Sequence, residues 1–308
     1  MLSGEKILVT GAGGQIGLPL AAYLARENEV TGVARFRREG SMDKVAALGI
    51  TPVALELSAG DLGVLDDDFT YVLHLAAFLG TGEDFDKALR INAEGTGLLL
   101  HHCRRAKAAL VMSTHSVYRP SDDPYFAYLE SSALGESSSE WFPTYSMSKI
   151  GEEAVARYCA RSYDLPVVIA RMNASYGPNG GLPAYHLDDV VSGAPVTQRF
   201  DPSPYSLIHQ DDINAQAEAL LDAASTPATI VNWAGDDVAT VQQWCDYASE
   251  LIGTTATVVV EERPGTQRGA VADVTRRLSL TGPCSVSWRD GIRSTLEARH
   301  PELARSPR

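Results

Sequence analysis

Residues 10–17 read Thr10-Gly11-Ala12-Gly13-Gly14-Gln15-Ile16-Gly17, and this stretch decides the fold. An apolar run over 6–9 precedes it, and a helix-like segment over 18–25 follows it. Strand, glycine turn and helix in this order are typical of a phosphate-binding loop, although a plain glycine-rich turn is the alternative. The glycines allow a tight turn, a close approach of the backbone to a pyrophosphate, and packing of the helix against the strand. The free N–H groups at the helix N-terminus then favour the phosphates. We predict cofactor contacts from Gly11, Gly13, Gly14, Gln15, Ile16 and Gly17.

Strand-like and helix-like segments alternate along the first half of the chain. The candidate strands are short and apolar, as buried parallel strands tend to be. They cover 6–10, 29–34, 51–57, 71–76, 110–113 and 166–170. The candidate helices between them cover 18–27, 43–48, 84–108 and 145–163. This alternation predicts a doubly wound α/β fold with a parallel sheet. Further along we expect helices over 184–191, 211–223, 241–251 and 289–298, and strands over 229–233 and 256–261.

Composition and charge limit the classes of partner. The chain has 308 residues, of which 44% are hydrophobic, enough for a sizeable core. Its formal net charge of -13 argues against nucleic acid or an anionic membrane as partner, because both require a basic face. No apolar run approaches the roughly 18 residues of a membrane span, and we expect no signal peptide. The cysteines are far apart, so we expect no metal site and reduced thiols in a cytoplasmic protein.

The end of the second predicted strand indicates which dinucleotide the loop prefers. An NAD site places an acidic residue there, which binds the adenosine ribose hydroxyl. Here that position is Ala34, and Arg35 follows it, with Arg37 and Arg38 nearby. An arginine binds a 2′-phosphate through a charge-assisted hydrogen bond, so we predict NADP in preference to NAD. A solvated basic loop is the alternative interpretation.

Further cofactor contacts are expected where the next strands end. Glu56, with Leu57 beside it, can meet the adenine amino group, although a surface role for this carboxylate is equally ordinary. The small side chains in Leu75-Ala76-Ala77 leave room for the cofactor. Asn92 lies in a helical stretch, where a buried amide can hold the active-site strand by hydrogen bonds.

The catalytic candidates lie on a strand end and on the helix predicted to begin at Tyr145. Tyr145 and Lys149 are four residues apart, so their side chains share one helix face. A nearby ammonium favours the phenolate and lowers the tyrosine pKa from about 10, so Tyr145 can exchange a proton with a substrate near neutral pH. Lys149 can also bind the nicotinamide ribose, and Thr114 would orient the reacting oxygen. We therefore predict hydride transfer between nicotinamide C4 and an alcohol or ketone carbon, with Tyr145 as the acid/base.

The order of these motifs resembles that of the extended short-chain dehydrogenases/reductases, the group that includes nucleotide-sugar epimerases and dehydratases. The matching segments span almost the whole chain and are 10–17, 74–77, 92–96, 113–118, 145–149, 171–178, 208–212 and 263–265. The resemblance implies a Rossmann domain with a smaller C-terminal substrate-binding lobe. It also implies that Thr114 joins the Tyr–Lys pair, and that a homodimer forms through the helices near 84–108 and 145–163.

Departures from the family pattern bear on the substrate. Dehydratases of this group carry Asp-Glu after the catalytic threonine, whereas this chain has His115-Ser116, which disfavours a 4,6-dehydratase. His115 is either an extra acid or base or a polar residue of the pocket. Asn173 lies one residue before the usual Asn of nucleotide-sugar enzymes, and Tyr205 stands where they place an Arg. These differences weaken the case for that substrate class, although arginines such as Arg263 could compensate. We predict substrate contacts at His115, Ser116, Asn173, Tyr176, Tyr185, Tyr205 and Arg263.

The predicted domain division follows the same resemblance. A Rossmann domain is expected over 1–171, with 201–235 returning to it, and a substrate-binding lobe over 172–200 and 236–308. Net dehydrogenase or reductase activity and nucleotide-sugar epimerisation with tightly held NAD both stay open, since they use the same three residues. A non-catalytic dinucleotide-sensing protein is a remote alternative, because such proteins usually lose the tyrosine or the lysine. The substrate can be a sugar, a sugar nucleotide, a polyketide-like ketone or a steroid-like ring.

Overall fold

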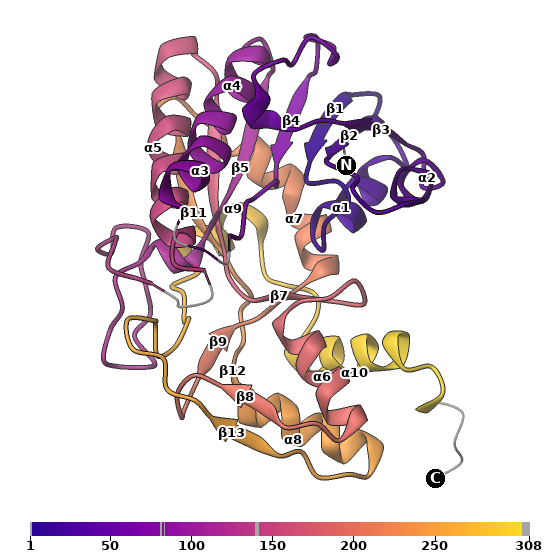
Figure 1. Ribbon diagram of the computed structural model, residues 1–308, viewed down its shortest axis with the longest axis vertical. Helices are drawn as coiled ribbons and strands as arrows, with labels where there is room; N and C mark the ends of the chain where they lie inside the picture. The colour runs from indigo at the N-terminus through magenta and orange to yellow at the C-terminus, as the bar shows by residue number, and fades with distance from the viewer. Residues whose placement is uncertain (1, 81, 83, 139–141, 304–308) are drawn as a thin grey trace. The chain divides into compact units, whose positions relative to one another are not determined.

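The computed structural model describes residues 2–80, 82, 84–138 and 142–303. The chain forms two compact units (Figure 1). The first unit is built from Met1–Val117, Ser138–Arg171 and Asn214–Val231. The second unit is built from Tyr118–Ser137, Met172–Ile213 and Asn232–Arg308. The ends of the predicted domains, at residues 1 and 304–308, lie outside the described residues.

A seven-stranded sheet forms the centre of the first unit, in the order β11-β6-β5-β4-β1-β2-β3. Its strands are β1 (Lys6–Thr10), β2 (Glu29–Ala34), β3 (Ile50–Ala54), β4 (Tyr71–His74), β5 (Ala108–Thr114), β6 (Val167–Met172) and β11 (Thr229–Trp233). The pairs β1–β2, β1–β4, β2–β3 and β4–β5 are parallel. The strand order reverses between β1 and β4, which is where doubly wound sheets bind ligands, at the carboxyl ends of their strands. The predicted doubly wound α/β fold is confirmed.

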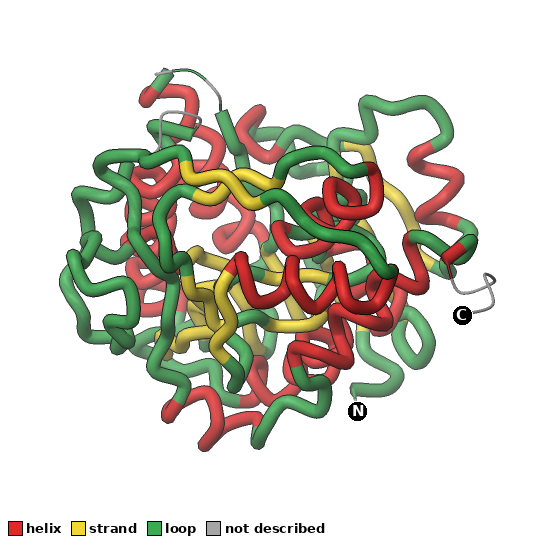
Figure 2. The backbone as a smooth tube through the Cα atoms, turned by 90° about the horizontal axis from the view of Figure 1, so that it is seen from below, coloured by secondary structure: helices red, strands yellow, loops and turns green. Residues whose placement is uncertain are grey.

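Helices flank this sheet, and Figure 2 draws the helices of the chain in red and the strands in yellow. They are α1 (Gly17–Leu24), α2 (Ser41–Ala46), α3 (Phe85–Leu89), α4 (Gly95–His102), α5 (Tyr145–Tyr163) and α7 (Gln210–Asp222), with short turns η1 (Leu57–Ala59), η2 (Arg90–Glu94) and η3 (His115–Val117). In the core, apolar residues of β5, α4 and α5 such as Val111, Leu99 and Ala156 pack together. This packing holds α5 against the strand that carries the predicted catalytic threonine.

The second unit has its own apolar core. Its elements are β7 (Ser175–Tyr176), α6 (Leu182–Ser192), β8 (Val196–Gln198), β9 (Pro204–Ser206), β10 (Ile208–His209), β12 (Val238–Thr240), α8 (Val241–Ile252), β13 (Val258–Val260), α9 (Thr275–Thr281) and α10 (Trp288–Arg299). Leu187 of α6, Trp244 of α8 and Ile292 of α10 are buried together in this core. Helix α8 begins with a capping box in which Thr240 and Gln243 satisfy each other's backbone N–H groups.

The domain boundaries differ from the predicted ones at three segments. The prediction assigned 118–137, 201–213 and 232–235 to the first domain, whereas all three belong to the second unit. Their hydrogen bonds give the reason. Tyr128 forms a bridge with Ala272, and β9 and β10 pair with β12 and β7 respectively.

The predicted helix over 84–108 is the largest error in secondary structure. The segment instead contains α3, the π-helical turn η2 and α4, which ends at His102. Cys103 leaves the helical conformation with φ -89° and ψ 21°, and β5 begins at Ala108, earlier than expected. The prediction also missed α9. It missed five short strands as well, which have too few residues to show a detectable alternation of apolar and polar side chains: β7, β8, β9, β10 and β12.

Candidate active site

The glycine turn lies between β1 and α1 and is tightly closed. Gly11 has φ +72°, and a Cβ there would lie 2.9 Å from the backbone nitrogen of Ala76. Gly14 donates its N–H to the Gly11 carbonyl oxygen at 2.8 Å, and a Cβ on Gly17 would overlap that same oxygen. Helix α1 starts without a side-chain cap and without an acidic residue in its first turn. The turn and the helix N-terminus therefore fit a pyrophosphate, as the sequence predicts.

A chain of buried hydrogen bonds joins the carboxyl ends of β1 and β4. The Thr10 hydroxyl accepts the two backbone N–H groups that follow His74, each at 3.2 Å, and so donates its own proton to His74 Nδ1 at 2.7 Å. His74 Nε2 then donates to the Thr96 hydroxyl at 2.7 Å, and Thr96 donates to the Asn92 carbonyl oxygen. Burial lowers the pKa of His74 to about 3, so the ring is neutral. This network holds Leu75 and Ala76 against the glycine turn.

The residues predicted to select the dinucleotide follow β2 and β3. Arg35 and Glu56 form an ion pair of 4.0 Å, and both side chains are partly exposed. Arg35, which is predicted to bind a 2′-phosphate, is therefore paired with Glu56, the carboxylate predicted to meet adenine. Phe36, with φ +42°, places its ring next to Gly13, because a Cβ on that glycine would lie 3.6 Å from the ring. Leu57 is buried.

Asn92 lies in the π-helical turn η2 and ties three segments together. Its side-chain oxygen accepts the Phe78 N–H at 2.7 Å, and its amide donates to the Phe78 carbonyl oxygen at 3.1 Å. The same amide donates to the Ser148 hydroxyl at 2.9 Å, and Ser148 donates to the Tyr145 carbonyl oxygen. Asn92 thus connects the loop after β4 to the first turn of α5. The sequence predicts a structural role for this amide toward the active-site strand, but its hydrogen bonds reach the loop and α5 instead of β5, and its cofactor contact stays a prediction.

Tyr145 and Lys149 lie one turn apart at the start of α5. The Lys149 ammonium is buried and donates to the Met112 carbonyl oxygen of β5 at 2.8 Å. Thr114 ends β5, and its hydroxyl accepts the Ser116 N–H at 3.2 Å. Burial raises the pKa of Tyr145, while the Lys149 charge and the Thr114 hydroxyl lower it and Glu152 raises it further. Lys149 lowers the Tyr145 pKa as the sequence predicts, but the net shift is upward, because burial and Glu152 act against the ammonium.

Two carboxylates on α5 escaped the sequence analysis. Glu153 accepts from Arg171 Nε at 2.8 Å and from its Nη2 at 2.7 Å, and it also accepts the Ser113 hydroxyl at 2.5 Å. Glu152 forms an ion pair with Lys149. Both glutamates are buried on the helix face that carries Tyr145 and Lys149. The helical spacing from the tyrosine is the signal that could have identified them.

His115 and Ser116 follow Thr114 and both lie in the short turn η3. Burial and the nearby Arg171 charge lower the pKa of His115 to about 3, so its ring stays neutral at physiological pH. The Ser116 carbonyl oxygen accepts the Ser146 hydroxyl at 2.5 Å, which joins this turn to α5.

The other predicted substrate residues belong to the second unit. Asn173 donates its amide to the Ala270 carbonyl oxygen at 2.9 Å. Tyr176 is buried in the core of this unit, where desolvation raises its pKa. Tyr185 is exposed on α6, Tyr205 lies 5.8 Å from the Trp244 ring, and Arg263 pairs with Glu261 at 2.9 Å. Their substrate contacts stay predictions.

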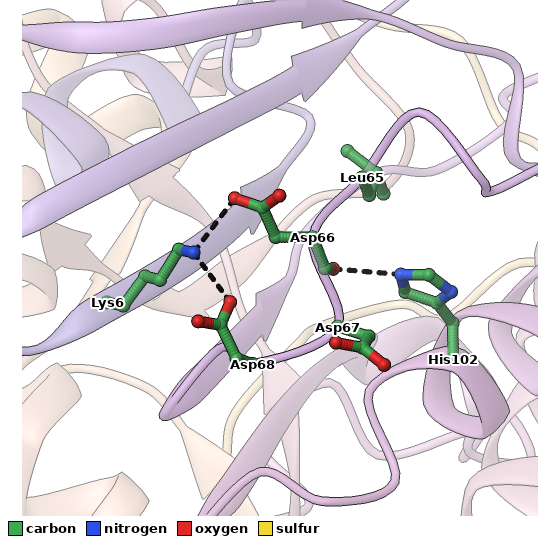
Figure 3. Close-up of a pocket in the computed structure, with 6 residues that line it drawn as sticks. All are labelled: Lys6, Leu65, Asp66, Asp67, Asp68 and His102. Atoms are coloured by element: carbon green, nitrogen blue, oxygen red, sulfur yellow. Dashed lines mark hydrogen bonds and ion pairs between the residues drawn. The ribbon is translucent and has the colours of Figure 1, made fainter.

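A polar pocket of about 480 Å³ lies at the other end of β1. As Figure 3 shows, Lys6 pairs with Asp66 and Asp68, and His102 contacts the Asp66 carbonyl oxygen. Lys6 begins β1, whereas the glycine turn follows its last residue. Ligands of doubly wound sheets bind at the carboxyl ends of the strands, so this pocket is not the candidate active site. Among the described residues, no group of three His, Cys, Asp or Glu could hold a metal, and no helix is long and apolar enough to span a membrane.

A doubly wound sheet with a glycine turn after β1 and a Tyr–Lys pair beside the end of β5 defines a class of dinucleotide-dependent enzymes. The chain belongs to the NAD dependent epimerase/dehydratase family, whose model matches residues 7–199. The resemblance seen in the sequence is thereby confirmed.

Curated relatives carry several activities. A dTDP-D-glucose 4,6-dehydratase of Dictyostelium discoideum is 29% identical over 56% of this chain and 44% of its own. A probable dTDP-glucose 4,6-dehydratase of Sinorhizobium fredii is 25% identical over 95% and 92%. A D-erythronate dehydrogenase of Cupriavidus necator is 30% identical over 51% and 52%. The chain spans 44 and 47% of the length of the first two relatives it matches.

Solved structures show the same fold at low sequence identity. UDP-glucuronic acid 4-epimerase from Bacillus cereus, in complex with UDP-glucuronic acid and NAD, has a TM-score of 0.83 and 23% identity, covering 96% of this chain and 99% of its own. A dTDP-glucose 4,6-dehydratase from Bacillus anthracis in complex with NAD has a TM-score of 0.82 and 19% identity, covering 98% of both chains.

Proposed function

We propose that the chain catalyses the NAD(P)-dependent interconversion of a secondary alcohol and a ketone on a sugar nucleotide. The observation that carries this is the pair Tyr145 and Lys149 on α5, in the same unit as the glycine turn and Thr114. When bound, the nicotinamide supplies the acceptor or donor of the hydride. Tyr145 takes the proton from the alcohol or gives it to the ketone, and Thr114 donates a hydrogen bond to the same oxygen. Lys149 stabilises the phenolate.

The first unit offers the groups that a dinucleotide requires. The pyrophosphate would bind the glycine turn and the uncapped start of α1. The adenosine would lie near Arg35, Glu56 and Leu57, and Lys149 would donate to the nicotinamide ribose. These assignments rest on the closed turn at Gly11 and on the position of each residue after its strand.

The names of the relatives support a sugar nucleotide as substrate, since UDP and dTDP sugars recur among them. The pair His115-Ser116 disfavours a 4,6-dehydratase, because neither residue is a carboxylate and His115 stays neutral. An epimerase is the first candidate. Net dehydrogenation is the second, supported by the match to D-erythronate dehydrogenase.

One experiment tests this proposal and separates the two candidates. The protein is incubated with NAD⁺ or NADP⁺ and a panel of UDP and dTDP sugars, while absorbance at 340 nm and proton NMR spectra are recorded. An epimerase changes the sugar without net absorbance, and a dehydrogenase produces one reduced cofactor for each sugar oxidised. If the protein binds a dinucleotide but changes none of these sugars, the proposed substrate class is overturned. A dinucleotide sensor then becomes the better account.

The cofactor preference is a finer proposal. Relatives of known structure were solved with NAD, whereas Ala34 and Arg35 support NADP in this chain. We expect NADP⁺ to bind more tightly than NAD⁺, and Arg35→Ala to weaken NADP⁺ binding alone. Calorimetric titration measures both constants. Tighter binding of NAD⁺ by the unaltered protein would overturn this preference, and the ion pair with Glu56 would explain the outcome.

A homodimer and a cytoplasmic location complete the proposal. Helices α4 and α5 pack together and expose Leu98 and Tyr158, at 39% and 65% of their surfaces. Apolar side chains exposed on adjacent helices support pairing with a second copy. Sedimentation of the protein and of Tyr158→Asp tests this pairing, since the variant is expected to be monomeric. Among the described residues, which include all four cysteines, no disulfide is formed, and this supports a reducing compartment.

A further inference from the structure

Glu152 is a buried carboxylate in direct contact with the proposed catalytic lysine. It lies three residues after Lys149 on α5, has no exposed surface, and forms an ion pair with the ammonium. Beyond this ion pair, neither carboxylate oxygen has a hydrogen-bond partner within the described part of the chain. A buried carboxylate that pairs with one buried ammonium is costly to remove from water, so its position beside Lys149 requires an explanation.

The other charged groups around Glu152 are already neutral or engaged. His74 of β4 approaches it to 3.9 Å through Nε2, but the ring is neutral and donates that proton to Thr96. Glu153, its neighbour on α5, is held by Arg171 and by the Ser113 hydroxyl. Lys149 is therefore the cation with which Glu152 is paired. The ionised form of Glu152 therefore offsets the positive charge of Lys149 at the ammonium itself.

The charge of Glu152 also affects Tyr145, because Tyr145 lies on the same face of α5 as Lys149 and Glu152. An unopposed ammonium at Lys149 would favour the phenolate, whereas a carboxylate in contact with that ammonium favours the neutral phenol. Glu152 is indeed among the causes that raise the pKa of Tyr145, together with burial. Burial likewise raises the pKa of Glu152 to about 7, against the opposing effect of Lys149.

We propose that Glu152 is a positioning residue that fixes the Lys149 ammonium against the Met112 carbonyl oxygen and offsets its charge at Tyr145. A Tyr145 phenol that keeps its proton can donate it to a carbonyl oxygen, which is the reductive half of the proposed interconversion. A bound reduced nicotinamide would supply the hydride to the ketone carbon, and Tyr145 would give its proton to the ketone oxygen, which would leave an alcohol and a phenolate. The role of Tyr145 as a proton donor rests on the proposed function. The effect of Glu152 on Lys149 and on the Tyr145 pKa does not depend on it.

Direct titration of Tyr145 tests the proposal without substrate. The full chain is labelled with tyrosine carrying ¹³C at Cζ, and the Tyr145 signal is identified by its loss in Tyr145→Phe. We expect Glu152→Gln to lower the titration midpoint of Tyr145 by about 1 pH unit or more, the size ordinary for a neighbouring charge. Glu152→Asp keeps the charge, so its Tyr145 midpoint is expected to lie close to that of the unaltered protein.

A matched control is Glu94→Gln, which removes an exposed carboxylate of the same unit and is expected to leave the midpoint unchanged. An unchanged midpoint in Glu152→Gln would overturn the proposal. If Glu152→Gln does not fold, Glu152→Met fills a similar volume without charge and carries the same expectation. If neither folds, Glu152 is a structural requirement and the proposal is wrong. Because the titration needs no turnover, an inactive protein with a shifted midpoint would contradict the proposed function alone.

Discussion

Arg171 and Glu153 form a bidentate ion pair whose side chains are only 2% and 4% exposed. Removing one partner leaves the other charge buried without compensation. We expect Arg171→Met to lower the free energy of unfolding by about 3–5 kcal/mol, measured by urea denaturation. The double variant Arg171→Met/Glu153→Met is expected to recover much of that loss, because no charge is then left alone.

An exposed pair supplies the control for this prediction. Arg105 and Asp67 form an ion pair in which both side chains are more than half exposed. Arg105→Met is expected to leave the urea midpoint within experimental error, because solvent screens such pairs. Equal losses in Arg171→Met and Arg105→Met would show that burial is not what gives the Glu153 pair its importance.

At the scale of the element, the glycine turn allows a sharp comparison of two substitutions. A Cβ on Gly17 would overlap the Gly11 carbonyl oxygen, whereas a Cβ on Gly13 would lie 3.6 Å from the Phe36 ring, an ordinary contact. Gly17 is the first residue of α1, where alanine has the higher helix propensity. We nevertheless expect Gly17→Ala to cost roughly 1–3 kcal/mol of stability through the clash.

Thermal unfolding of the two variants checks this expectation. Gly13→Ala should unfold close to the temperature of the unaltered protein, while Gly17→Ala should unfold several degrees lower and bind the dinucleotide more weakly. Should Gly17→Ala be as stable as Gly13→Ala, the turn would be looser than the structure indicates.

Element boundaries were predictable where apolar spacing and packing agree. The helix over 145–163 is confirmed residue for residue, because its buried face keeps a helical period from Ser146 to Ala160. The helix over 84–108 was not predictable in the same way. Its wider π-helical turn presents Asn92 to Phe78 and Ser148, and these hydrogen bonds join segments far apart in the sequence.

At the scale of the whole molecule, buried neutral histidines predict loss of stability in acid. The pKa is lowered from 6.5 to about 3 in His74 and His115 and to about 4 in His186. Between pH 6.5 and 4 the unfolded chain therefore binds more protons than the folded one, so stability falls as pH falls. Each proton contributes about 1.4 kcal/mol per pH unit. Glu152 acts in the opposite direction, because its raised pKa lets the folded state hold a proton from about pH 7 downward.

Urea denaturation at a series of pH values measures this slope, and His186→Gln isolates one of its sources. His186 Nδ1 accepts the Trp244 Nε1–H at 3.2 Å, which protonation at Nδ1 would break, and a glutamine oxygen can accept the same bond. In this variant we expect the slope of unfolding free energy against pH to fall by about 1.4 kcal/mol per pH unit, the contribution of one proton. A stability that does not change between pH 7 and pH 5 would contradict the prediction.

The candidate site was predictable where chemistry follows local spacing. The glycine turn and the Tyr145–Lys149 pair are each contained within one short segment, so their geometry follows from the turn and the helix. The environment of the tyrosine was not predictable, because the burial of Glu152 depends on packing across β4 and α5. The burial of Tyr176 was not predictable for the same reason, because one sequence does not reveal which aromatic residues fill a core.

The central claim is that Tyr145 exchanges the proton during hydride transfer, and the turnover of Tyr145→Phe tests it most directly. The rate is measured on whichever sugar nucleotide the unaltered protein converts, with dinucleotide affinity measured on the same samples. We predict that turnover falls by about 10²- to 10⁴-fold while dinucleotide affinity stays within a few-fold of that of the unaltered protein. A variant that keeps the original turnover rate would contradict the account.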